Sequence, residues 1–328
     1  MRLSTIIKKI ASRKEIQIKP PVLIDIGASG ELNSIWKTIA PFSICIAFDA
    51  DKREFDYIEK SDSVFKKQYV FNKIVVASTD KKTQPFYLTQ NPYCSSLLKP
   101  DAESLKQFHY SGLFEIKEVL EIDVIELKSA LAQLNINYVD WFKTDSQGTD
   151  LRLYASLSDE IQKNALVLEF EPGFIDAYIG EDKMVDVLNY MEKKNFFLIN
   201  FTIKGALRLG KEAFEGLFKS DRMKKVSSHI HNKAPGWAEM VYMNKLDEEM
   251  FTAREFMLAW LFATLYNHHD FAFVYAQKGH AKTGDALFVN LKEYSEKKLK
   301  NKLFTFSGFA RLLNIIIKKY TSDKIPQY

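Results

Sequence analysis

The chain has 328 residues, of which 46% are hydrophobic and 27% charged, with 13 glycines and 9 prolines; this composition is that of a globular protein with a core and excludes a disordered or collagen-like chain. Its two cysteines, Cys45 and Cys94, are too few for a disulfide framework and predict reduced thiols in a cytoplasmic protein. The net charge of +4 is uneven, because residues 1–20 carry +5, residues 286–328 carry +6 and the remainder carries −7. This distribution disfavours nucleic-acid binding and places any contact with an anionic membrane at the two basic ends.

Three regions are expected along the chain. The patterns predict a basic N-terminal helix or arm over residues 1–20, a sheet domain over 21–248 and a helical extension over 249–328. No run of apolar residues reaches the roughly 20 that span a bilayer. Two helices of the extension resemble one helical-repeat hairpin, but a single copy favours helices packed on the sheet domain. The tail segment 309–320 suits either packing on the core or contact with an anionic membrane.

From Pro20 onward, strand-like and helix-like stretches alternate, which is the pattern of a parallel sheet covered by helices. The strands are expected at residues 22–26, 44–48, 73–77, 138–143, 165–170, 196–203 and 239–243. Amphipathic helices are expected at residues 32–39, 127–134 and 181–194. The last two strands follow each other at antiparallel spacing. The sequence therefore predicts an α/β fold with a doubly wound, mostly parallel seven-stranded sheet.

The first predicted strand runs straight into a turn of small residues, from Asp25 to Gly30. Small residues let a ligand approach the backbone, and the free N–H groups of a helix start attract a carboxylate or phosphate. Asp49 ends the second strand 22 residues after Gly27, the spacing at which an acidic side chain binds a ribose diol. The turn is not G-x-G-x-x-G, and Glu31 would repel a pyrophosphate. An amino-acid cofactor such as S-adenosylmethionine therefore fits better than a dinucleotide.

The end of the fourth predicted strand holds a second group of polar residues. Asp145, Gln147 and Asp150 surround Gly148 just beyond an apolar strand. Because the carboxyl ends of parallel strands meet at one edge, these side chains are expected near Asp49. A carboxylate there can hold an amine or take a proton from an attacking hydroxyl.

Three stretches carry these features: Leu23–Ala28, Ala47–Asp51 and Phe142–Asp150, with Val167-Leu168-Glu169 following in register. Together they resemble the FkbM-type family of S-adenosylmethionine-dependent methyltransferases, and the third is similar to that family's Lys-x-Asp-x-Glu-Gly-x-Glu signature. The resemblance covers about residues 21–244. It implies a class I methyltransferase (Rossmann-like) fold, S-adenosylmethionine as cofactor, and O-methylation of a sugar, a glycan or another small hydroxylated metabolite. Gln147 departs from the family, which usually has Glu there.

The resemblance also implies roles for individual residues. Asp145 is expected to be the base that takes the hydroxyl proton, and Asp49 to bind the ribose. The remaining cofactor contacts would be Asp25, Gly27, Ala28, Ser29, Gly30, Ala50 and Ser78. Substrate contacts would be Ser95, Ser96, Gln147, Glu169 and Glu171. No metal ligand is assigned.

Simpler roles remain open for several of these residues. Asp145 can cap a helix that begins near Thr149, since Asp is a preferred cap. Glu169 and Glu171 can be solvated residues at a strand end. Ser95 and Ser96 can form a turn after Asn91-Pro92.

Other functional classes also remain open. His229 and His231 can be a metal site, but a surface pair is the simpler interpretation, and a metal held by Asp145 and Glu171 has only a weak signal. A nicotinamide-dependent sugar-modifying enzyme predicts NAD binding instead. A non-catalytic methyltransferase-like adaptor would bind a protein partner through its helical tail, with Gln147 marking lost activity.

Overall fold

The computed structural model describes residues 2–28, 34–51, 64–247, 249–302 and 313. The chain divides into two compact units, one of residues 16–247 and the other of residues 1–15 together with 248–328. The division falls between Glu15 and Ile16, within the basic N-terminal segment of residues 1–20.

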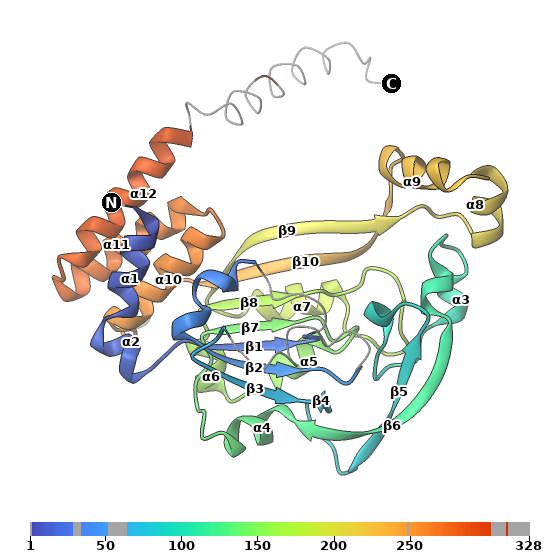
Figure 1. Ribbon diagram of the computed structural model, residues 1–328, viewed down its shortest axis with the longest axis horizontal. Helices are drawn as coiled ribbons and strands as arrows, with labels where there is room; N and C mark the ends of the chain where they lie inside the picture. Colours follow the sequence, from blue (N-terminus) through green and yellow to red (C-terminus); the bar gives the residue numbers. More distant parts are fainter. Residues whose placement is uncertain (1, 29–33, 52–63, 248, 303–312, 314–328) are drawn as a thin grey trace. The chain divides into compact units, whose positions relative to one another are not determined.

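A seven-stranded sheet in the order β3-β2-β1-β7-β8-β10-β9 forms the frame of the larger unit (Figure 1). The first five strands in this order run parallel, whereas β10 pairs antiparallel with both β8 and β9. The predicted α/β class and mostly parallel sheet are confirmed, and the architecture is compatible with a Rossmann-like fold. The strands are β1 (Val22–Ile26), β2 (Ile44–Phe48), β3 (Lys67–Phe71), β7 (Trp141–Thr144), β8 (Val167–Phe170), β9 (Phe196–Ala206) and β10 (Ala234–Asn244).

The core of this unit forms because alternate side chains of the buried strands meet the apolar faces of helices. Ile24 of β1 and Phe142 of β7 share one buried cluster with Leu131, Tyr154 and Val187 from three helices. Burial of each such side chain stabilises the fold by roughly 1.5–3 kcal/mol. The helices of this unit are α3 (Ala102–Leu105), α4 (Leu127–Gln133), α5 (Asp150–Ala155), α6 (Asp159–Asn164), α7 (Met184–Met191), α8 (Lys211–Leu217) and α9 (Asp221–Ile230). Helix α2 (Lys14–Ile18) crosses the boundary between the two units.

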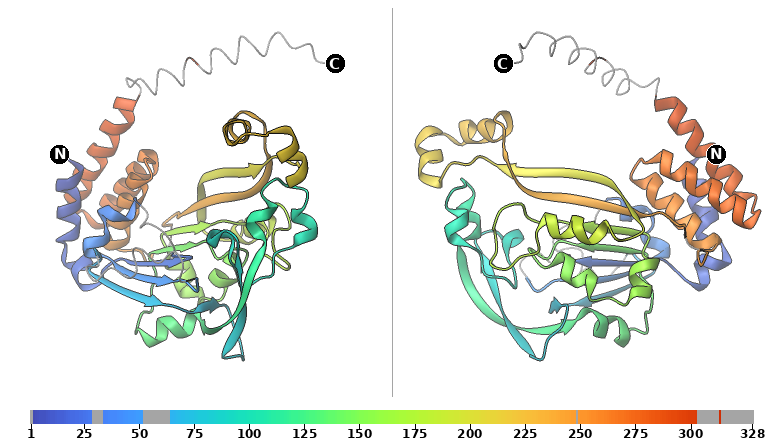
Figure 2. Two further views of the ribbon diagram at one scale, coloured as in Figure 1. Left: turned by 45° about the vertical axis from the view of Figure 1, so that its right-hand side comes forward. Right: turned by 180° about the vertical axis from the view of Figure 1, so that it is seen from behind.

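The strand expected at residues 73–77 is not part of the large sheet. Residues Ile74–Val76 form β4, which pairs with β6 (Ile116–Glu126) in a three-stranded sheet completed by β5 (Thr83–Thr89). The Ile74 and Val76 side chains of β4 are buried in a small separate core with Phe86 and Leu88, whereas Val75 belongs to the main core of the unit. The third strand of the large sheet is β3, a partly exposed edge strand whose sequence lacks a continuous apolar run. In Figures 1 and 2 the small sheet stands beyond the carboxyl ends of the parallel strands.

The prediction of an amphipathic helix at residues 32–39 is also wrong for residues 34–39, the part of this range that the structure describes. Residues 29–33 lie outside the described residues, and the chain that follows forms two short 3-10 turns, η1 (Trp36–Thr38) and η2 (Ala40–Phe42). Pro41 lacks the N–H that would continue an α-helix. Trp36 and Ile39 are nevertheless fully buried. The apolar pattern therefore predicted correctly that these residues belong to the core, but not that they form an α-helix. Two more 3-10 turns, η4 (Pro92–Cys94) and η5 (Ser111–Phe114), lie in the connection between β5 and β6.

The smaller unit is helical. Its helices are α1 (Leu3–Ala11), α10 (Ala253–Leu265), α11 (His269–Thr283) and α12 (Leu287–Lys302). Trp260 of α10 donates its indole N–H to Ser295 Oγ of α12 at 2.9 Å, and Gly284, at φ 67°, ends α11. Among the described residues, no helix is long and apolar enough to cross a membrane. The predicted tail segment 309–320 lies outside the described residues except for Leu313.

Candidate functional site

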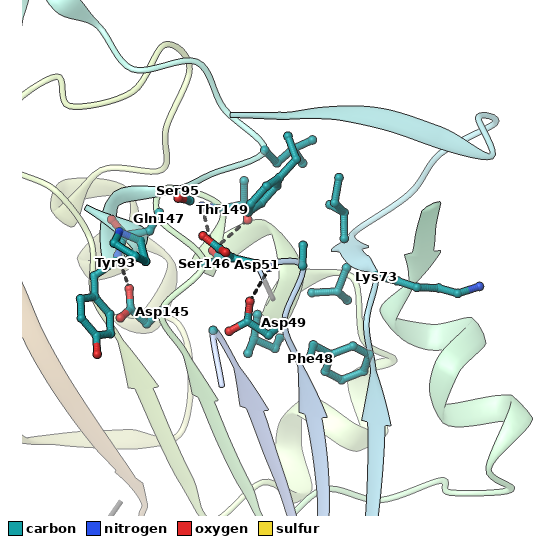
Figure 3. A pocket seen from close by; sticks show the side chains of 18 residues that line it. Phe48, Asp49, Asp51, Lys73, Tyr93, Ser95, Asp145, Ser146, Gln147 and Thr149 are labelled. Carbon is teal, nitrogen blue, oxygen red and sulfur yellow. Dashed lines mark hydrogen bonds between the residues drawn. The ribbon is translucent and has the colours of Figure 1, made fainter. Parts of the chain in front are cut away.

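A pocket lies where the carboxyl ends of β1, β2 and β7 meet the small sheet (Figure 3). Ligands of open α/β sheets bind at this edge. The pocket encloses about 680 Å³, part of it open to solvent. Its described lining consists of Ile26, Gly27, Phe48, Asp49, Ala50, Asp51, Lys73, Ile74, Val75, Phe86, Pro92, Tyr93, Ser95, Leu97, Asp145, Ser146, Gln147 and Thr149.

The glycine turn after β1 lies against the turn after β7. Gly27 adopts φ +78°, and a Cβ added there would lie 2.2 Å from the carbonyl oxygen of Asp145. Only glycine fits both conditions. The backbone N–H groups of Gly27 and Ala28 both donate to the carbonyl oxygen of Phe48, at 3.0 and 3.2 Å. These two amides are therefore not free to bind an anion, contrary to the expectation for this turn; Ser29 and Gly30 lie outside the described residues.

Asp25 lies within β1 and does not line the pocket, although it was expected to contact the cofactor. Its carboxylate is buried and forms an ion pair with Lys143 Nζ at 2.7 Å, because Asp25 and Lys143 are register partners on β1 and β7. Burial opposes the lysine charge, but attraction to Asp25 and their hydrogen bond dominate and raise the pKa of Lys143. The pair neutralises two charges beneath the pocket and fixes β7 to β1.

The turn after β2 contributes two carboxylates to the pocket. Asp49 Oδ1 accepts the backbone N–H of Asp51 at 2.8 Å, which holds the carboxyl group at the strand end. Burial raises the pKa of Asp49 to about 7, and the neighbouring carboxylates Asp51, Asp25 and Asp145 add to this shift. Ala50 also lines the pocket, as expected. The predicted meeting of Asp49 and Asp145 at one edge is thus observed (Figure 3).

Asp145 follows β7 and lines the pocket. Burial raises its pKa to about 6; Lys143 and a hydrogen bond from Gln147 Nε2 lower it, while Asp150 and Asp25 raise it. Helix α5 has Thr149 as its N-cap, so the interpretation of Asp145 as a helix cap is wrong. A carboxylate with a raised pKa is a stronger base than an exposed one.

Gln147 connects Asp145 to two neighbouring loops. It sits at φ +57°, and its Oε1 lies 2.8 Å from Tyr178 Oη. Ser96 Oγ donates to the Gln147 carbonyl oxygen at 2.8 Å. Ser96 therefore holds the loop in place and does not line the pocket, whereas Ser95 does line it and accepts the backbone N–H of Thr89 at 3.2 Å.

The other expected contacts lie outside the pocket. Glu169, in the middle of β8, accepts the indole N–H of Trp141 at 2.5 Å. Burial raises the pKa of Glu171 to about 9, with Asp145 as the next cause, so this carboxyl group is neutral at physiological pH and not a solvated charge. Ser78 is exposed beyond β4, because the strand it was assigned to belongs to the small sheet.

The charged residues of the pocket lining indicate which charge a ligand should carry. Among the described lining residues, three carry carboxyl groups, Asp49, Asp51 and Asp145, and one, Lys73, is a cation. The ammonium of Lys73 points away from them in Figure 3 and lies 3.8 Å from Asp123. The described lining therefore favours a cationic ligand over one that carries a pyrophosphate.

The two histidines of the predicted pair do not share one extended segment. His229 lies in the last turn of α9, where its Nδ1 is 2.7 Å from the carbonyl oxygen of Lys225, and His231 follows the helix end. Within the described part of the chain, no group of three or more His, Cys, Asp or Glu side chains is arranged to hold a metal ion. Cys45 and Cys94 are both buried and free.

Several residues of the site were not foreseen. Phe86 and Leu97 reach the pocket from β5 and the loop after it, because the small sheet folds over the edge of the large one. Tyr178 reaches Gln147 across 31 residues of sequence. Asp51 lies in the stretch Ala47–Asp51, but no role was predicted for it. A strand-end carboxylate two residues after Asp49 was the one signal that pointed to it.

Comparison with protein-family models, with curated proteins and with solved structures found no match to this chain. Inference about function therefore depends on the pocket and its residues.

Proposed function

We propose that the chain is an S-adenosylmethionine-dependent O-methyltransferase that acts on a hydroxyl group of a sugar, a glycan or another small hydroxylated metabolite. The observation that carries the proposal is the pocket at the carboxyl ends of β1, β2 and β7, where Asp49, Asp51 and Asp145 meet an apolar wall. A cofactor with a sulfonium and an ammonium group matches this combination of charge and apolar surface.

The order of the strands supports the same proposal. Numbered within the large sheet alone, the strands lie in the order 3-2-1-4-5-7-6, and strand 7 is antiparallel to its neighbours. This mostly parallel order is compatible with the Rossmann-like fold that the FkbM-type resemblance implies. The resemblance covers the same sheet and the same strand ends.

The residues of the pocket fit the cofactor in two places. Asp49, at the end of β2, is positioned to accept hydrogen bonds from a ribose diol, as the spacing from Gly27 suggests. Ile74, Val75 and Phe86 supply apolar surface for an adenine ring. A dinucleotide fits less well, because its pyrophosphate would face the three carboxyl groups of the lining.

Asp145 would take the proton of the acceptor hydroxyl. Its raised pKa, about 6, leaves it mostly ionised at neutral pH yet more basic than an exposed aspartate. Gln147 donates to Oδ1 and so orients the carboxylate. When bound, S-adenosylmethionine supplies an electrophilic methyl group whose leaving group is neutral. Alignment of acceptor and donor would then supply most of the acceleration, and proton removal the rest.

Methyl transfer from labelled S-adenosylmethionine to a cell-glycan extract tests this proposal. We expect transfer by the wild-type chain and a loss of about 100-fold or more in Asp145→Asn, the range for removal of a general base. Asp159→Asn, an exposed carboxylate of α6, is the matched control and should keep full activity. Equal transfer by wild type and Asp145→Asn would exclude the base role. Cofactor binding without transfer to any hydroxyl acceptor would instead favour the adaptor hypothesis.

A further inference from the structure

The connection between β9 and β10 contains the helices α8 and α9. Strand β9 runs parallel to β8, because both are antiparallel to β10. The carboxyl end of β9 therefore lies at the same edge of the sheet as the pocket. Figures 1 and 2 show α8 and α9 standing beyond this end, away from the body of the sheet.

Helix α9 exposes an apolar face. Met223, Val226 and Ile230 are 50%, 49% and 69% exposed, and their spacing places them on one side of the helix. Leu217, at the end of α8, is 60% exposed. A hollow of about 550 Å³ borders this face, and the buried Ser227 Oγ that lines it has no hydrogen-bond partner among the described residues.

Basic residues flank the apolar face. Residues 217–233 contain five Lys and Arg residues, Lys219, Arg222, Lys224, Lys225 and Lys233, and one acidic residue, Asp221. All five basic residues are at least partly exposed. An exposed apolar stripe on a short helix with a cationic flank matches an anionic bilayer, where the stripe enters the acyl boundary and the lysines meet the headgroups.

From this complementarity we propose that the α8–α9 connection docks the chain onto an anionic membrane surface. This site differs from the two basic ends that the sequence suggested for such contact. In α1, the apolar residues Ile6, Ile7 and Ile10 are buried, so this helix does not present them to a membrane. The docking does not depend on the proposed methyl transfer.

Contacts lead from the docking helices toward the pocket. Lys211 of α8 lies 3.3 Å from Glu115, and Phe214 packs on His109 with ring centroids 4.6 Å apart. Phe114, which lies beside Glu115 in the sequence, contacts the ring of Tyr178. The Tyr178 hydroxyl group in turn donates a hydrogen bond to Gln147. If the proposed function holds, a docked chain would have its pocket edge near the bilayer, which suits an acceptor hydroxyl on a membrane lipid or a lipid-linked glycan.

Vesicle co-sedimentation of the full chain tests the docking without a catalytic readout. The probes are phosphatidylcholine vesicles with and without phosphatidylserine. We expect binding only to the anionic vesicles. The triple variant Arg222→Gln, Lys224→Gln, Lys225→Gln should bind about 100-fold more weakly, at about fivefold for each basic residue near the surface. The matched control replaces exposed lysines elsewhere: Lys66→Gln, Lys163→Gln and Lys193→Gln.

A second triple variant tests insertion of the apolar face. Met223→Ser, Val226→Ser and Ile230→Ser should also lose binding, whereas Val119→Ser, Ile179→Ser and Val185→Ser, which change exposed apolar residues elsewhere, should not. Thermal melting should be nearly unchanged in all variants, since every site is at least partly exposed. Binding that persists in both α9 variants, or that falls equally in the controls, would overturn the proposal by assigning membrane contact to the basic ends. Absence of wild-type binding to anionic vesicles would also overturn it and leave a protein as the partner of this face.

Discussion

Removal of the Gln147 side-chain amide should make Asp145 more basic. Gln147 Nε2 donates to Asp145 Oδ1, and a hydrogen bond to a charged group contributes about 1.5–3 kcal/mol. At about 1.4 kcal/mol for each pKa unit, its loss in Gln147→Leu should raise the pKa of Asp145 by about one to two units. From its value of about 6, the pKa should therefore reach between about 7 and 8.

The assay is a titration of the Asp145 carboxyl carbon by NMR in protein labelled at aspartate, with Asp145→Asn used to assign the signal. Tyr178→Phe is the matched control. It removes the hydroxyl group that donates to Gln147 Oε1 but keeps the hydrogen bond from Gln147 Nε2 to Asp145 Oδ1. The control should leave the pKa within about half a unit, less than the loss of a charged hydrogen bond would cause. A pKa in Gln147→Leu that is unchanged or lower would refute the account of how Gln147 acts on Asp145.

Two further predictions concern stability. Gly27→Ala should lower the free energy of unfolding by at least about 2 kcal/mol more than Gly180→Ala in urea denaturation. Both glycines have φ near +77°, but a Cβ at Gly27 meets the Asp145 carbonyl oxygen at 2.2 Å and one at Gly180 meets nothing within 4 Å; equal losses would contradict this. From about pH 7 to about pH 9 the free energy of unfolding should fall by about 2 kcal/mol, because the raised pKa of Glu171 keeps a proton bound in the folded state that the unfolded chain has released. This part of the fall should be absent in Glu171→Gln, and an equal fall in the wild type and in Glu171→Gln would show that the carboxyl group is ionised in the fold.

The buried strands of the large sheet could be predicted because they form continuous apolar runs. β1, β2, β7 and β8 are buried on both faces, and most of their residues are apolar; the polar exceptions are Asp25, Lys143, Thr144 and Glu169. β3 was missed because it is an edge strand in which every residue is at least partly exposed. The apolar run at 74–76 was placed in the wrong sheet, since hydrophobicity shows that a strand is buried but not which partner buries it. That error moved the expected adenine contact to Ser78.

The strand-end carboxylates could be predicted because topology alone brings the ends of parallel strands together. Asp49 and Asp145 meet at the pocket for this reason. The role of Asp25 could not be derived, because its pairing with Lys143 depends on the register of β1 against β7. Tyr178 was not foreseen either, since its hydrogen bond to Gln147 joins loops whose conformation no periodic pattern describes.

Calorimetric titration with S-adenosylhomocysteine tests the central claim most directly, because it measures the pocket's ligand without requiring the acceptor. At a pH above about 7, where Asp49 is mostly ionised, the wild-type chain should bind S-adenosylhomocysteine in preference to NAD. Asp49→Ala should weaken binding by about 10- to 100-fold, the loss of a hydrogen bond to a charged group, while Asp159→Asn should bind as the wild type does. No binding of S-adenosylhomocysteine by the wild-type chain, or tighter binding of NAD, would contradict the proposed function.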